Sequence, residues 1–198
     1  MPDIEEDAPQ ELEEQTATDG AGPLLQRDYW AGIPHSRLTP EEIITLLSQQ
    51  FPRFAPELIA SFAFVQVPPL KVGDEMHIHI RGYGDCHVRV LLVEPRSITL
   101  MTLEDHYEAG RITFGAWADE AGQTVFKIRS RARVRSKRHL LSFLSGGHVF
   151  QKQLWLHFVQ NVARECNEEL EVEVHEETEE MHADLADLGE TIAPTFVV

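Results

Sequence analysis

Apolar residues in the first third of the chain follow the helical period. Residues 39–42 place a threonine before a proline and two acids, which is the usual start of a helix, and residues 43–47 supply its apolar side. A second short helix is expected over 56–64, ended by the two prolines at 68–69. Ahead of both helices, residues 25–31 are a candidate for a short strand.

From residue 71 onward the apolar period changes from 3.6 to 2, which is typical of strands with one buried face. Alternation and turn residues predict strands over 76–80, 86–90, 97–103, 111–118 and 123–135. Because short turns join these strands, consecutive strands are expected to pair antiparallel.

A long helical region is expected over about 137–166, interrupted at Gly146 and Gly147. The apolar stripe of its second half has i, i+4 spacing and consists of Phe150, Leu154, Phe158 and Val162. A curved sheet with one apolar face needs a cover, and this helix supplies one. The sequence therefore predicts an α+β fold in which a curved antiparallel sheet wraps around a long C-terminal helix.

Acidic residues are concentrated in two arms. Residues 1–22 contain eight Asp or Glu and residues 168–198 contain eleven, and neither segment contains Lys or Arg. All 17 basic residues and the other 14 acids lie in 23–167, so a mildly basic domain accounts for +3 of the net charge of −16. We expect a disordered acidic arm over 1–22, one domain over 23–167 and an acidic C-terminal arm over 168–198.

Cys86 and Cys166 are too few for a disulfide framework, and their spacing matches no zinc pattern. The first residues lack the charged and apolar regions of a secretory signal peptide. No apolar run approaches the roughly 18 residues that a membrane-spanning helix needs. We therefore expect reduced thiols, no transmembrane segment, no cofactor and a cytoplasmic protein.

Residues 102–110, Thr-Leu-Glu-Asp-His-Tyr-Glu-Ala-Gly, resemble the T-L-x-x-H-P-E-x-G segment of a domain-of-unknown-function branch of the START/birch-allergen-like (SRPBCC) superfamily. The strand and helix that follow fit the pattern of this branch at Ile128, Ser130, Gly146, Gly147 and Gln153. Tyr107 stands where the branch has proline, and residues 84–86 read Gly-Asp-Cys where the branch has Asn-Pro-Cys. The resemblance covers about residues 25–165.

This resemblance implies a helix-grip fold with a cavity between the sheet and the last helix, which in the superfamily often holds an apolar ligand. It implies no established activity for the branch. We therefore expect a non-enzymatic domain that binds an unknown small apolar or amphipathic ligand. The residues expected to line the cavity are Phe114, Ile128, Ser130, Phe150, Leu154 and Phe158. The alternative for the aromatic positions is that they fill the core instead of lining a cavity.

A second class of function is a charge-driven interaction. Basic residues at alternate positions of the last predicted strand share one face; they are Lys127, Arg129, Arg131, Arg133, Arg135 and Lys137. They predict a stripe that binds anions, an acidic partner or the acidic arms of this chain. The alternative is a solvated face balanced by a neighbouring strand, for example through Asp28. No aromatic residues interleave with the cations along this strand, so sequence-specific nucleic-acid recognition is not expected.

Three histidines, His77, His79 and His87, share the polar face of the first hairpin and are candidates for a metal site. Extended strands separate the side chains of residues i and i+2 by about 6.6–6.8 Å. This separation makes chelation difficult, so an exposed polar face is expected and no metal is predicted.

His106 and Glu108 are candidates for an acid–base pair of a cyclase- or hydrolase-like enzyme, provided that both face the cavity. No nucleophile or third orienting group lies near them in the sequence. We therefore expect hydrogen bonds that stabilise a loop.

The C-terminal arm begins with acids at Glu169, Glu171 and Glu173, which alternate with apolar residues. This period of 2 predicts an extended segment that adds a strand to the sheet or lies on it. We expect the arm to meet the basic strand as a salt-sensitive cover, and the alternative is a solubilising tail.

Overall fold

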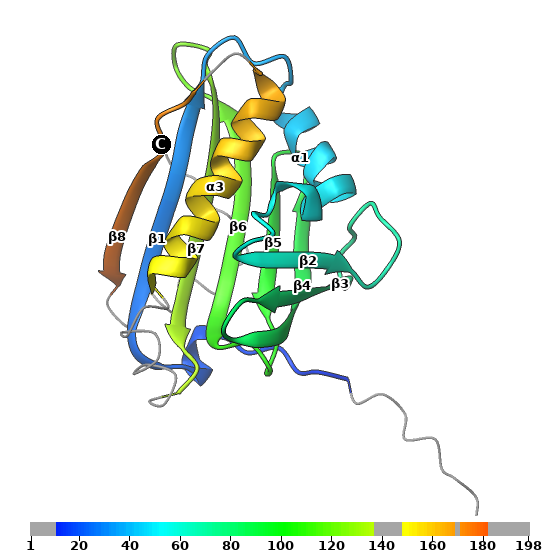
Figure 1. Cartoon of the computed structure of the whole chain (residues 1–198), viewed down its shortest axis with the longest axis vertical. Helices are drawn as coiled ribbons and strands as arrows, with labels where there is room; N and C mark the ends of the chain where they lie inside the picture. The colour runs from blue at the N-terminus through cyan, green and yellow to red at the C-terminus, as the bar shows by residue number, and fades with distance from the viewer. Residues whose placement is uncertain (1–10, 137–147, 169–170, 182–198) are drawn as a thin grey trace, which may run out of the picture.

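The computed structural model describes residues 11–136, 148–168 and 171–181. Within them, eight strands form one antiparallel sheet in the order β2-β3-β4-β5-β6-β7-β1-β8 (Figure 1). The strands are β1 (Ala21–Ile33), β2 (Ala60–Phe64), β3 (Glu75–Ile80), β4 (Gly84–Glu94), β5 (Ser97–Thr102), β6 (Glu108–Ala118), β7 (Thr124–Val134) and β8 (His175–Met181).

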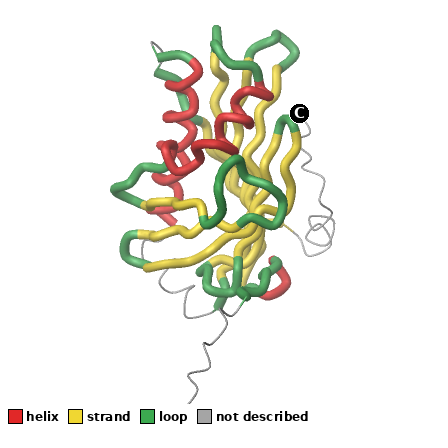
Figure 2. The backbone as a smooth tube through the Cα atoms, turned by 90° about the vertical axis from the view of Figure 1, so that its right-hand side faces the viewer, coloured by secondary structure: helices red, strands yellow, loops and turns green. Residues whose placement is uncertain are grey.

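Two helices lie on the same side of this sheet (Figure 2). The long helix α3 (His148–Cys166) crosses β1 and β7, and α1 (Pro40–Gln50) continues into the short 3₁₀ helix η2 (Phe51–Phe54). An aromatic cluster fills the space between the helices and the sheet; it consists of Phe51, Phe54, Phe62, Phe114, Trp155 and Phe158. The predicted α+β architecture, with a curved antiparallel sheet and a long C-terminal helix, is confirmed.

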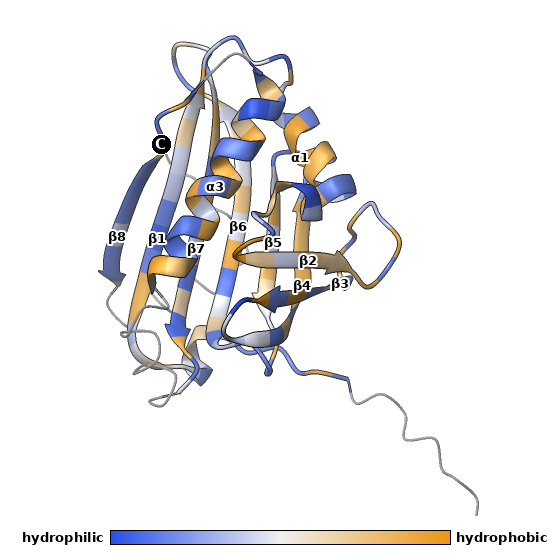
Figure 3. Ribbon diagram, viewed as in Figure 1, coloured by the Kyte–Doolittle hydropathy of each residue, from blue (hydrophilic) through white to orange (hydrophobic). Residues whose placement is uncertain are grey.

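The side of the sheet that faces α3 is apolar, and the opposite side, which we call the outer face, is polar. Along β7, the alternate residues Phe126, Ile128 and Ala132 are buried, whereas Lys127 and Arg129 between them are only half-buried. In Figure 3 this alternation gives way to a uniformly hydrophilic β8 at one edge of the sheet. Neither described helix combines the length and apolar character that crossing a bilayer requires.

The helix predicted after Thr39 is confirmed as α1. The Thr39 hydroxyl accepts a hydrogen bond from the Glu42 amide, and the Glu42 carboxylate accepts one from the Thr39 amide. These reciprocal bonds satisfy two backbone donors that the first turn would otherwise leave open. The apolar residues of α1 then pack on the β5–β6 side of the sheet.

The second helix, predicted over 56–64, is wrong. Residues 60–64 form β2, an edge strand that pairs with β3, and Ala60 and Phe62 are buried while Ser61 and Ala63 are exposed. This is an alternation with period 2. The partner β3 decides the outcome, because pairing with it satisfies the backbone and buries Phe62 in the aromatic cluster.

The N-terminal acidic arm contains more structure than expected, and the added strand of the C-terminal arm lies after the segment for which it was predicted. Residues 11–22, predicted to be disordered, contain a bridge between Glu14 and Leu103, the 3₁₀ helix η1 (Ala17–Asp19) and the start of β1. The candidate strand at 25–31 is the centre of β1. In the C-terminal arm the added strand is β8, which follows the alternating segment 169–174 and pairs with β1.

Candidate functional site

A partly enclosed cavity lies between the sheet and the first turns of α3. The space that the centre of a water molecule can reach inside it measures about 50 Å³. Its apolar wall comes from β2–β7 and α3; it consists of Phe62, Ile78, Ile80, Val88, Leu100, Ile112, Ala132, Leu154 and Trp155. Its polar end is formed by Thr102, His106, Glu108, Ser130 and Gln151. The cavity is therefore amphipathic.

A buried ion pair stands at the polar end. Nη1 of Arg27 on β1 donates to Oε1 of Glu108 on β6 at 2.9 Å, and both side chains are almost fully buried. The side-chain amide of Gln151 on α3 donates to the other oxygen, Oε2. Burial lowers the pKa of Arg27, but the charge and hydrogen bond of Glu108 outweigh burial and raise it overall. Arg27 therefore keeps its charge, and Glu108 is its partner in the ion pair.

Three polar atoms of the cavity wall have no hydrogen-bond partner among the residues that the structure describes. They are Oγ of Ser130, Oε1 of Gln151 and Nε1 of Trp155, and each is fully buried. A buried polar group without a partner costs about 1–3 kcal/mol, so most such groups in folded proteins have one. Together these atoms offer an N–H donor, a carbonyl acceptor and a hydroxyl that can do either.

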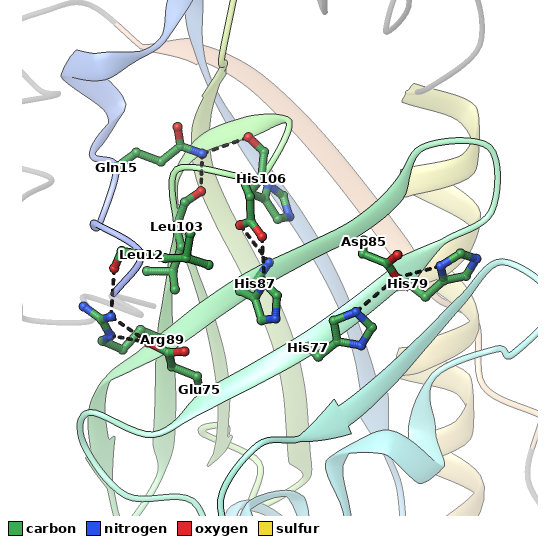
Figure 4. Close-up of polar contacts among 11 residues, drawn as sticks. Leu12, Gln15, Glu75, His77, His79, Asp85, His87, Arg89, Leu103 and His106 are labelled. Atoms are coloured by element: carbon green, nitrogen blue, oxygen red, sulfur yellow. Dashed lines mark hydrogen bonds and ion pairs between the residues drawn. The ribbon is translucent and has the colours of Figure 1, made fainter. Parts of the chain in front are cut away.

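The loop between β5 and β6 supplies His106 and Tyr107 to the cavity, and the N-terminal segment holds this loop. The buried side-chain nitrogen of Gln15 lies 2.7, 2.9 and 2.8 Å from the carbonyl oxygens of Leu103, His106 and Glu108, so its two N–H groups are shared among three acceptors. Figure 4 shows the contacts with Leu103 and His106. Gln15 could not be singled out from the sequence, because a glutamine in an acidic segment resembles any other polar residue of a disordered arm.

Arg89 holds the same segment farther upstream. Its guanidinium donates to the Leu12 carbonyl at 2.9 Å, pairs with Glu75 at 2.6 Å and lies 3.5 Å from Glu14 (Figure 4). The segment 11–15 is thus fastened to β4 and to the β5–β6 loop. It forms part of the structure that positions the cavity wall.

His106 and Glu108 both line the cavity, but they do not form an acid–base pair through their side chains. Nδ1 of His106 accepts from the backbone amide of Glu108 at 3.1 Å, and the Glu108 carboxylate is occupied by Arg27 and Gln151. Burial lowers the pKa of His106, so the imidazole is neutral. The His106 imidazole thus holds the end of the β5–β6 loop to the first residue of β6.

The structure distributes the residues predicted to line the cavity over three environments. Ser130 and Leu154 line it. Phe114, Ile128 and Phe158 are completely buried in the core beside it, and Phe150 is 50% exposed. Arg27 and Gln151 were missed. Arg27 lies two residues from both Leu25 and Tyr29, so the three side chains share one face of a strand. A charged residue on such an apolar face indicates that it has a buried partner.

The histidines of the first hairpin bind neighbouring carboxylates. His77 and His79 both contact Oδ1 of Asp85, at 3.0 and 2.9 Å, while Nδ1 of His87 lies 2.6 Å from Asp105 on the β5–β6 loop (Figure 4). Among the described residues, no group of three or more His, Cys, Asp or Glu side chains is placed to hold a metal ion.

The basic residues of β7 lie on the outer face, as their spacing predicts. Asp28 on β1 binds two of them: Lys127 at 2.7 Å, and Arg129 through two hydrogen bonds of 2.7 Å. Arg131 and Arg133 continue the row, and Arg135 follows the end of the strand in an exposed position. Lys137, the last residue of the predicted stripe, lies outside the described residues.

Comparison with known proteins bears on the fold. No family model matches the chain, and no curated protein matches it. The solution structure of the KanY protein superposes with a TM-score of 0.54 over 73% of this chain and 97% of that one, at 7% identity. The chain is similar in fold to KanY.

Two further solved structures are similar at lower scores. Ms6760 from Mycobacterium smegmatis has 12% identity and a TM-score of 0.47, over 78% of this chain and 94% of that one. Ginseng major latex-like protein 151 from Panax ginseng has 15% identity and a TM-score of 0.41, over 67% of this chain and 97% of that one.

Proposed function

We propose that this protein is a helix-grip, non-enzymatic domain that binds a small, uncharged, amphipathic ligand in the cavity between its sheet and α3. The observation that carries this proposal is a set of three buried polar atoms in the cavity wall that have no partner among the described residues: Ser130 Oγ, Gln151 Oε1 and Trp155 Nε1. A ligand with one hydrogen-bond donor and one acceptor would satisfy them. Its apolar part would contact Ile112 and Leu154.

The charge of the ligand follows from the ion pair. Because Glu108 is already neutralised by Arg27, the acid at the polar end of the cavity offers no free charge for an ionic group to balance. Transfer of an unpaired charge into such a site is unfavourable. Alcohols, phenols and amides fit this requirement, whereas carboxylates and ammonium ions do not.

The size of the cavity limits how much of the ligand is enclosed. A volume of 50 Å³ corresponds to about three to five water molecules on the scale of one per 10–15 Å³. The enclosed part is therefore a small group. Val149 and Phe150, half-exposed on the first turn of α3 beside Gln151, would contact any part of the ligand that remains outside.

The test begins with protein purified without detergent. Native mass spectrometry identifies a retained ligand, and saturation-transfer NMR screens small neutral phenols, alcohols and amides against their charged analogues. We expect neutral compounds to bind. The variant Ser130→Leu, which fills the polar end of the cavity, should abolish binding, whereas Thr124→Leu at the opposite end of the same strand should bind as the wild type does.

Two results would contradict ligand binding in this cavity. One is equal binding of neutral compounds by the Ser130→Leu and Thr124→Leu proteins, which would place the ligand elsewhere. The other is a negative outcome of both measurements: native mass spectrometry finds no retained ligand, and no neutral compound binds in the NMR screen. Preferential binding of the charged analogues would be consistent with a ligand-binding cavity but would contradict the proposal that the ligand is uncharged.

A further inference from the structure

The side chain of Gln151 connects the buried ion pair to the cavity. Gln151 belongs to the first turn of α3, and its side chain is buried. Its nitrogen donates to Oε2 of Glu108, whose other oxygen accepts from Arg27. Its oxygen, Oε1, has no hydrogen-bond partner among the described residues, although Gln151 lines the cavity. The two ends of this amide therefore have different environments.

The ion pair determines which end of the Gln151 amide faces Glu108. A carboxylate only accepts hydrogen bonds, whereas a side-chain amide has a nitrogen that only donates and an oxygen that only accepts. Turning the amide over would bring its oxygen against Oε2 of Glu108, so that two buried acceptors would face each other without a donor. This arrangement is unfavourable. Oε1 of Gln151 is therefore fixed on the side away from Glu108, as an acceptor in the cavity wall.

Trp155, one helical turn after Gln151, presents the opposite requirement. An indole Nε1 only donates, and Nε1 of Trp155 is buried without a partner among the described residues. The indole packs against Phe62, Phe114 and Phe158, with ring centroids 6.4, 5.7 and 5.9 Å away, so it cannot turn freely. Residues i and i+4 lie on the same face of a helix. A fixed acceptor and a fixed donor thus line the same side of the cavity.

We propose that Gln151 and Trp155 make the cavity selective for ligands whose polar group both donates and accepts a hydrogen bond, and that the Arg27–Glu108 ion pair sets this selectivity by positioning Gln151. This inference rests on the proposed function and narrows its ligand class to alcohols, phenols and amides that carry an N–H. Ketones, ethers and esters only accept, so they satisfy Trp155 and leave Oε1 of Gln151 buried and unpaired. Such a site rejects an analogue that lacks the donor.

The experiment compares cyclohexanol with cyclohexanone, which share a carbon skeleton and differ in the polar group. NMR titration of the Trp155 indole Nε1–H signal measures both dissociation constants, because both compounds accept from this group. The variant Trp155→Phe identifies the signal among those of the three tryptophans. In the wild-type protein we expect cyclohexanol to bind about tenfold more tightly than cyclohexanone.

Variants of the ion pair separate positioning from general stability. Arg27→Met/Glu108→Leu removes the carboxylate that orients Gln151, so the amide can present its nitrogen to the ketone. We expect cyclohexanone to bind this protein as tightly as cyclohexanol does, and adding Gln151→Met should remove the gain in ketone binding. Arg27→Met/Glu108→Gln, in which residue 108 can offer either end of an amide, should lose selectivity in the same way.

The matched control is Gln153→Met, at a partly buried position of α3 that is not part of the cavity wall. This protein should keep the wild-type ratio of the two dissociation constants. A merely structural role of the ion pair would weaken the binding of both compounds equally and leave the ratio unchanged.

Three outcomes would overturn the inference. Equal binding of the two compounds by the wild-type protein would do so and leave the proposed function standing. A ratio that persists in both ion-pair variants would show that Arg27 and Glu108 do not position Gln151. Binding of neither compound would also overturn it, and would overturn the proposed function as well if the other neutral compounds fail to bind.

Discussion

At the scale of single residues, a few buried polar side chains define the cavity. Arg27, Glu108 and Gln151 come from β1, β6 and α3 and meet through hydrogen bonds at the polar end. Removal of both charged partners of a buried ion pair is often tolerated, but removal of one leaves an uncompensated charge. Each residue of the set therefore depends on the others.

The variant Glu108→Ala should lower the free energy of unfolding by about 3 kcal/mol, because it leaves Arg27 charged and buried. The double variant Arg27→Met/Glu108→Leu should recover most of this loss. Urea denaturation measures both values, and Glu104→Ala, two residues outside β5, serves as the control. If the double variant were no more stable than Glu108→Ala, the ion pair would not account for the loss.

At the scale of elements, the N-terminal segment and the β5–β6 loop form one unit. Gln15 binds three carbonyl groups of the loop region, and the Gln15 amide itself donates to the Thr102 carbonyl at 2.9 Å. Asp105 fastens the other side of the loop by accepting from the backbone amide of His87 at 3.0 Å. The loop is ordered by elements far from it in sequence.

We expect Gln15→Ala to destabilise the protein by about 2 kcal/mol, because buried carbonyl groups lose their donor. Hydrogen exchange should accelerate in residues 102–109 more than in β7, which the substitution does not touch. Glu13→Ala, an exposed neighbour, should change neither quantity. A uniform increase in exchange across the sheet would indicate that the segment does not act locally on the loop.

At the scale of the whole molecule, acidic and basic residues are concentrated in different parts of the chain, and the fold brings some of them together. The net charge is −16, yet the central domain is basic. β8 brings acids against the edge of the sheet, where Glu176 pairs with Lys152 of α3. On the outer face Glu177 is the cross-strand partner of Asp28, which adds negative charge beside an acid.

Because excess negative charge repels itself in the compact state, added salt should stabilise this protein. We expect the Tm to rise by a few degrees between about 20 mM and about 300 mM NaCl, since the Debye length falls to less than the spacing of most surface charges. Differential scanning calorimetry measures the change. The Glu13→Gln/Glu57→Gln/Glu120→Gln protein, which is less negative, should show a smaller rise, and an equal or larger rise would exclude self-repulsion as the cause.

The sequence by itself determined the features that depend on local periodicity and charge. Alternation from residue 76 onward identified β3–β7 and the two faces of the sheet, because side chains of a strand alternate between its faces. The helical stripe identified α3, and the cap at Thr39 identified α1. The same periodicity placed Ser130 on the sheet face and Leu154 on the helix face that meet in the structure.

Only the tertiary structure decided which distant residues meet. Residues 60–64 became a strand because β3 offered a partner, and residues 11–15 are held in place because Arg89 and three loop carbonyls bind them. Glu108 meets Arg27 and Gln151 across 81 and 43 residues of chain. The physical reason is that a buried polar group is stable only with its partner, and a partner supplied by folding has no signature in the local pattern.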